Sequence, residues 1–173
     1  MKYIVLSLIL SLILTLLACT SSGLPAGHQR AEILNIRDFT LAQIDQNEPE
    51  LIYQLRAAAG YAIFSNQKNN KIKLPEGLGV GVIHNNGNGA NYYLLADSEL
   101  VSKPNRRFIV LFLTDAEIQS FITYAKIIND KSLMAAHPKI DLNARAIKIY
   151  QVNIDGQTTL ITVDSARFWQ SDR

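Results

Sequence analysis

The chain has 173 residues, of which 48% are hydrophobic and 18% are charged, and its formal net charge at pH 7 is +2. With 17 basic against 15 acidic side chains it is no polycation. This balance disfavours nucleic acid as the main partner, because such binding needs clustered positive charge. Much of the apolar excess lies at the N-terminus, and the remainder has the length of one globular domain.

The N-terminus carries the pattern of an export signal. Residues 3–18 form an uncharged, largely apolar run after Lys2, shorter than the about 20 residues that span a bilayer. The run ends in Leu16-Leu17-Ala18-Cys19, which resembles the lipobox of bacterial lipoproteins. We therefore expect residues 1–18 to be a lipoprotein signal peptide and Cys19 to be acylated. An uncleaved anchor helix, or cleavage at another position, is the alternative.

Cys19 is the only cysteine, so acylation leaves no unpaired thiol in the exported chain. Several acyl chains, at roughly 0.8 kcal/mol per buried CH₂, anchor a protein stably. Thr20 follows the cysteine where inner-membrane lipoproteins carry Asp, and this resemblance favours the outer membrane, facing the periplasm. Residues 19–29 are interpreted as the acylated cysteine and a tether, and residues 30–173 as a single domain.

The first half of the domain predicts two helices followed by strands. Periodic apolar residues indicate a helix over 31–44 and a second one from Asn47 to Gly60, with Pro49 in its first turn. Apolar runs then predict strands, and two Asn-Gly pairs between the second and third of them predict a hairpin. These strands cover residues 61–64, 77–83, 91–95 and 106–113.

The second half predicts one further helix and a closing hairpin. Thr114 and Glu117 have the spacing of a capping box, in which each side chain bonds the other residue's amide. Residues 146–154 and 157–163 flank an Asp155-Gly156 turn. The order predicts an α+β fold: N-terminal helices, a mainly antiparallel sheet with one packed helix, and a C-terminal β-hairpin.

No residue pattern indicates an enzyme, a metal site or a cofactor. The histidines, His28, His84 and His137, are far apart and form no ligand pair, and no nucleophile elbow occurs. A hydrolase would need a cleft that gathers His84 or His137 with carboxylates. Both of these histidines adjoin predicted turns, which predicts exposure.

Three glycines alternate along one predicted strand, at positions 77, 79 and 81, and leave one face of it without side chains. Such a face either admits a ligand or membrane, or lets a neighbouring element approach closely. We favour close packing. The spacing differs from the G-x-G-x-x-G phosphate cradle, and no helix follows.

Basic residues gather in two short segments, which we treat as candidate contacts to anionic lipid head groups. Each such charge near a membrane contributes about 1 kcal/mol. Alternatively they are solvated charges that protect a sheet edge. The candidates are Lys68, Lys71, Lys73, Arg106 and Arg107.

The order of segments resembles the SYLF domain family, also called the YSC84-like lipid-binding domain. The resemblance is carried by Ala58-Ala59-Gly60-Tyr61-Ala62-Ile63-Phe64, Gly77-Leu78-Gly79-Val80-Gly81, Arg107-Phe108-Ile109-Val110-Leu111-Phe112, Ile149-Tyr150-Gln151 and Arg167-Phe168-Trp169. It implies lipid or phosphoinositide binding in eukaryotic members, an envelope role in bacterial members, and no catalytic residues.

Taken together, these patterns predict a lipoprotein anchored in the outer membrane through Cys19. Its domain would be a non-enzymatic binding module for an anionic lipid or another envelope component. A protein–protein adaptor in the envelope is the alternative, and a hydrolase is a third.

Overall fold

A computed structural model describes residues 26–66, 72, 74, 77–97, 101, 106–125 and 136–170. The predicted signal peptide, Cys19, and the three candidate lysines Lys68, Lys71 and Lys73 lie outside these residues. In the described part of the chain, no helix combines the length and apolar character needed to cross a membrane.

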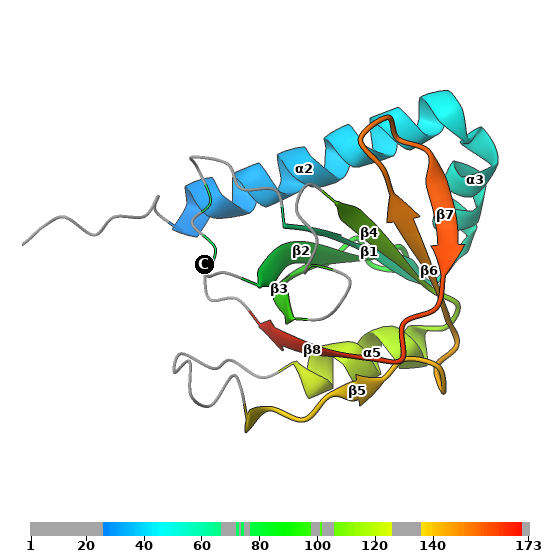
Figure 1. The fold of residues 1–173 in the computed structure, drawn as a ribbon. Coiled ribbons are helices and arrows are strands. Elements are labelled where there is room, and N and C mark those ends of the chain that lie inside the picture. The colour runs from blue at the N-terminus through cyan, green and yellow to red at the C-terminus, as the bar shows by residue number, and fades with distance from the viewer. Residues whose placement is uncertain are drawn as a thin grey trace, which may run out of the picture.

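Within the described residues, two helices precede the first strand, and one helix lies between strands (Figure 1). The elements in chain order are α2 (Ala26–Asn47), α3 (Pro49–Ala57), β1 (Gly60–Ser65), β2 (Leu78–Asn85), β3 (Asn91–Asp97), β4 (Arg107–Phe112), α5 (Asp115–Tyr124), β5 (Ile140–Asp141), β6 (Ile147–Val152), β7 (Thr158–Ile161) and β8 (Ser165–Gln170).

The strands form one curled sheet in the order β5-β8-β3-β2-β1-β4-β6-β7. Every pairing is antiparallel. The helices α2 and α3 lie on one face, and α5 lies on the other, beside β8 (Figure 1). The predicted α+β class is therefore confirmed, including the β6–β7 hairpin.

The central strands β1 and β4 supply side chains to both layers because successive residues of a strand point to opposite faces. Ala62 and Phe64 join the core under α5, whereas Tyr61 and Ile63 pack under α2 and α3. All six residues of β4 are buried. The continuous apolar run predicts this for residues 108–112 but not for Arg107.

A proline separates α2 from α3. Pro49 has no amide hydrogen to continue the first helix, but it suits the first turn of the second. Glu48, between the helices, accepts hydrogen bonds from the backbone nitrogen of Thr158, at 2.6 Å, and from its hydroxyl. The bend is thereby fixed to β7, far along the chain.

The alternating glycines serve packing. A Cβ atom at Gly81 would lie 2.4 Å from the carbonyl oxygen of Ile63 and 2.4 Å from the Phe64 ring, and one at Gly79 would lie 2.5 Å from Val101. Side chains cannot occupy such space, so the close-packing interpretation is confirmed at these two positions.

The helix α5 begins as predicted, but only half of the capping box forms. The Thr114 hydroxyl accepts from the amide of Glu117, at 3.3 Å. The Glu117 carboxylate, however, accepts from the backbone of Ala146 and from Arg145, both at 3.4 Å. Glu117 therefore ties α5 to the segment that leads into β6, because Ala146 and Arg145 compete with the amide of Thr114 for its carboxylate.

Candidate functional site

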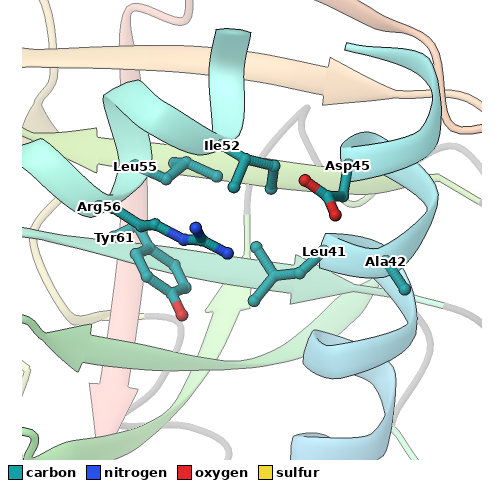
Figure 2. A pocket seen from close by; sticks show the side chains of 7 residues that line it. All are labelled: Leu41, Ala42, Asp45, Ile52, Leu55, Arg56 and Tyr61. Atoms are coloured by element: carbon teal, nitrogen blue, oxygen red, sulfur yellow. The ribbon is translucent and has the colours of Figure 1, made fainter. Parts of the chain in front are cut away.

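The bend between α2 and α3 leaves a pocket of about 260 Å³ above β1 (Figure 2). Its lining is Leu41, Ala42 and Asp45 from α2, Ile52, Leu55 and Arg56 from α3, and Tyr61 from β1. The interior wall is apolar and the two charged side chains come from different helices. We call this the α2–α3 pocket.

Local hydrogen bonds hold the end of α3 that carries Arg56. The side chain of Asn86, in the β2–β3 turn, donates to the carbonyls of Leu55 at 2.7 Å and Ala58 at 2.9 Å. These carbonyls lack helical partners at a helix C-terminus. The hairpin that the Asn-Gly pairs predict therefore also fixes one wall of the pocket.

The two charges of the pocket are free to meet a ligand. Figure 2 shows the Arg56 guanidinium extending between Tyr61 and Leu41, with the Asp45 carboxylate on the opposite helix. Neither side chain forms an ion pair or a hydrogen bond with another described residue. An apolar wall with one cation and one anion suits an amphipathic ligand with a polar head.

Tyr61 contributes a protonated hydroxyl at neutral pH. Burial raises the pKa of Tyr61 above 10.0, and Asp38 raises it further, while Arg37 and Arg56 lower it by smaller amounts than burial raises it. The phenol is therefore available as a hydrogen-bond donor or acceptor at the base of the pocket.

Three hydrogen-bonded polar side chains, those of His84, Asn91 and Arg37, lie next to Tyr61. The His84 ring is 5.4 Å from the Tyr61 ring, and His84 Nδ1 is 2.9 Å from Asn91 Oδ1. Arg37 also donates to this Oδ1, at 3.2 Å. Since arginine only donates, the Asn91 atom is the oxygen, and we infer that His84 carries a hydrogen on Nδ1.

The prediction that Arg107 contacts a head group is wrong. Its side chain is only 1% exposed and lies between α2 and β6. It donates to the Thr40 hydroxyl at 3.3 Å and to the Asn153 carbonyl at 2.8 Å, and Phe39 lies over it, 5.5 Å away. Successive strand residues point to opposite faces, and the register of β4 directs Arg107 inward.

Burial lowers the pKa of the Arg107 guanidinium below its usual value. The guanidinium still carries its charge at neutral pH, because this group stays protonated in proteins. Among the described residues no carboxylate pairs with it.

Arg106 is half-buried and donates to Gln151 at 2.6 Å. Of the five candidate head-group residues, the structure describes Arg106 and Arg107, of which the first is half-buried and the second is interior.

The histidines do not assemble a catalytic or metal centre in the described residues. His84 bonds Asn91, and the α2–α3 pocket that contains Asp45 does not include it. His137, expected to be exposed, is only 9% exposed. No group of three or more metal-binding side chains occurs in the part of the chain that the structure describes.

A second pocket, of about 220 Å³, lies where the curled sheet brings its ends together. Leu142, next to β5, and Ile149 and Ile161, from β6 and β7, share its lining. These strands stand at opposite ends of the strand order.

Comparison with known proteins found no family model that matches the chain and no matching curated protein. The resemblance to the SYLF family stays a prediction.

Sequence reasoning missed the α2–α3 pocket entirely. Its one sequence signal is the Glu48-Pro49 helix break, which predicts that two helices meet at an angle. Tyr61, which lines the pocket at the bend between α2 and α3, can be assigned to it only from the strand register.

Proposed function

We propose that the chain is a bacterial envelope lipoprotein whose domain binds a lipid or another envelope component without converting it. The helix α2 begins at Ala26, so the domain starts within the predicted tether and not at residue 30. Cys19 would carry acyl chains that hold the protein on the outer membrane, facing the periplasm. The α2–α3 pocket carries the proposal, because it joins an apolar wall to two charges that lack partners among the described residues.

The size of the pocket restricts the ligand. About 260 Å³ is below the roughly 300–1,000 Å³ typical of drug-sized ligands, so the pocket suits a head group and the start of a chain. Arg56 matches a phosphate oxygen, and Asp45 matches an amine. An ethanolamine phospholipid offers both charges beside apolar chains.

The anchor would keep the pocket near lipid. The helix α2 begins at Ala26, seven residues after Cys19. A chain spans at most about 3.5 Å per residue, so these residues reach no further than about 25 Å. Tethering raises the effective concentration of a surface ligand, and weak head-group contacts then suffice.

Lipid retention tests the pocket. The full chain is extracted from membranes in mild non-ionic detergent, and the phospholipid bound per protein is quantified by mass spectrometry. We expect Arg56→Gln and Asp45→Asn to lose most of the bound phospholipid. The charge-matched controls Lys139→Gln and Asp155→Asn, at exposed positions, retain it. Equal retention in all four variants contradicts the proposal.

Mass spectrometry of the mature N-terminus tests the anchor independently. We expect the natural protein to begin at an acylated Cys19, and Cys19→Ala to remain unacylated. A natural chain that begins at Met1 with an unmodified sulfur contradicts this part of the proposal.

A protein–protein adaptor is the second candidate. Among the strands that the structure describes, the edge strand β7 pairs with β6 alone, and Leu160 on it is 61% exposed. An exposed sheet edge is a common binding surface for an extended segment of a partner. Crosslinking in cells separates the two functions: one dominant protein adduct at Leu160 supports the adaptor, and lipid adducts at the α2–α3 pocket support the first proposal.

A further inference from the structure

Three buried polar atoms that have no hydrogen-bond partner among the described residues lie close together, away from the α2–α3 pocket. They are Tyr124 Oη at the end of α5, His137 Nε2 before β5, and Trp169 Nε1 on β8. The Tyr124 and His137 rings are 4.7 Å apart, and the His137 and Trp169 rings are 6.2 Å apart. The Trp169 and His137 side chains are 1% and 9% exposed.

Strand pairing and hydrogen bonds hold the segments of Trp169 and His137 in place. The β3–β8 register pairs Leu95 with Trp169 and Asp97 with Arg167. Arg167 Nε donates to the backbone oxygen of His137 at 2.7 Å, and its Nη1 forms an ion pair with Asp97 at 3.2 Å. A single buried polar group without a hydrogen bond already destabilises the folded state. A cluster of three such groups therefore indicates that a ligand supplies the missing hydrogen bonds.

The donor set restricts the chemistry of that ligand. The indole nitrogen of Trp169 only donates, so its partner must be an acceptor, whereas the Tyr124 hydroxyl and the His137 ring both donate and accept. The Arg167 guanidinium also acts electrostatically on Tyr124. Asp97 already offsets the positive charge of this guanidinium. The surroundings therefore favour a ligand with one negative charge over a ligand with two.

We propose that Tyr124, His137 and Trp169 form a small binding site for a carboxylate. The two oxygens of a carboxylate share one carbon, so they can accept hydrogen bonds from donors that lie side by side. Trp169 donates to one oxygen, and Tyr124 and His137 donate to the same or the other oxygen. The site is separate from the α2–α3 pocket and does not depend on the function proposed for it.

The single tryptophan of the chain makes the site directly observable. In the ¹⁵N-labelled full chain in non-ionic detergent, the indole N–H gives one resonance, which is followed while acetate or inorganic phosphate is added. We expect acetate to move it downfield with saturation, and phosphate to move it little. Tyr124→Phe keeps the ring, removes one donor and should weaken acetate binding about tenfold, which corresponds to about 1.4 kcal/mol.

The matched control is Tyr53→Phe, which removes a hydroxyl at a position that is 67% exposed and should bind acetate as the parent does. An indole resonance that acetate does not move overturns the proposal, and shows that an ordered water satisfies the cluster. Equal binding by the Tyr124→Phe and parent chains, or binding of phosphate as tight as that of acetate, also overturns it. Retained dispersion of the amide spectrum verifies that each variant is folded.

Discussion

The two faces of the sheet are built differently. Under α5, aromatic rings fill the layer: Phe121 lies 4.9 Å from Phe112 and 5.2 Å from Phe168. Under α2 and α3 the layer instead contains a buried arginine, Arg107, and leaves the α2–α3 pocket. The comparison indicates that the α5 face supplies stability, whereas the α2–α3 face accepts polar groups and empty volume where a ligand can bind.

The largest expected effect comes from emptying the α5 face. Phe121→Ala removes a fully buried ring and should lower the free energy of unfolding by about 4 kcal/mol. Phe39→Ala, on the other face at 57% exposure, should cost less than about 1 kcal/mol. Denaturant titration of both variants measures the difference. Equal losses would contradict the proposed division between the faces.

Charge reversal at Arg107 should be the next largest effect. Arg107→Glu buries a carboxylate against the Asn153 carbonyl and should destabilise the fold by about 3 kcal/mol. Arg106→Glu, half-buried beside Gln151, should cost less than about 1 kcal/mol. Thermal unfolding compares the two. A loss of membrane binding in Arg107→Glu would then reflect unfolding and not a lost head-group contact.

A smaller effect is expected where β2 meets β1. Gly81→Ala places a methyl group 2.4 Å from the Ile63 carbonyl oxygen and should cost about 2 kcal/mol, since an overpacked core strains its neighbours. Gly27→Ala, in the first turn of α2 with nothing within 4 Å, should leave stability unchanged or slightly higher. Chemical denaturation of the pair measures both. An unchanged Gly81→Ala protein would mean that this strand face is open.

The smallest effect concerns pH. Burial raises the pKa of Tyr61 in the folded state, so above pH 10.0 the unfolded chain releases this proton before the folded chain does. The unfolded state then binds fewer protons, and stability falls as pH rises through this window. Burial acts in the same direction at Tyr124 and Tyr150.

Tyr61→Phe should therefore lose less stability than the parent between about pH 9 and about pH 11. The exposed Tyr53→Phe is the control and should follow the parent. Unfolding midpoints in denaturant at several pH values provide the measurement. Identical slopes for Tyr61→Phe and the parent would show that the phenol is not desolvated in the folded protein.

Local signals predicted most of the elements. The Asn-Gly pairs predicted the β2–β3 hairpin, and Asn85 stabilises that turn by accepting from the amides of Gly87, at 2.8 Å, and Asn88, at 3.2 Å. Asp155-Gly156 predicted the β6–β7 hairpin, and Gly156 indeed has a positive φ of 86°. The residues that stabilise a turn are neighbours in the sequence, so a turn can be predicted without knowledge of the fold.

Other features depend on distant segments. The sequence predicts a closing hairpin over residues 146–163, yet a further strand, β8, follows it and inserts between β5 and β3. His137 next to Pro138 predicted exposure, but Arg167 holds its backbone and the ring is buried. In each case a partner at least 24 positions away decided the outcome, and the local sequence pattern does not reveal that partner.

The amino-acid order alone determined the α+β class and the two hairpins, because periodicity, turn residues and apolar runs act over a few neighbouring positions. The export signal at residues 1–19 is a prediction from the same kind of local pattern. Only the tertiary structure decided that Arg107 is interior, that Asp45 and Arg56 face one pocket, and that Tyr124, His137 and Trp169 meet. These outcomes follow from strand register and from the angle between α2 and α3. Both depend on which distant surfaces pack together.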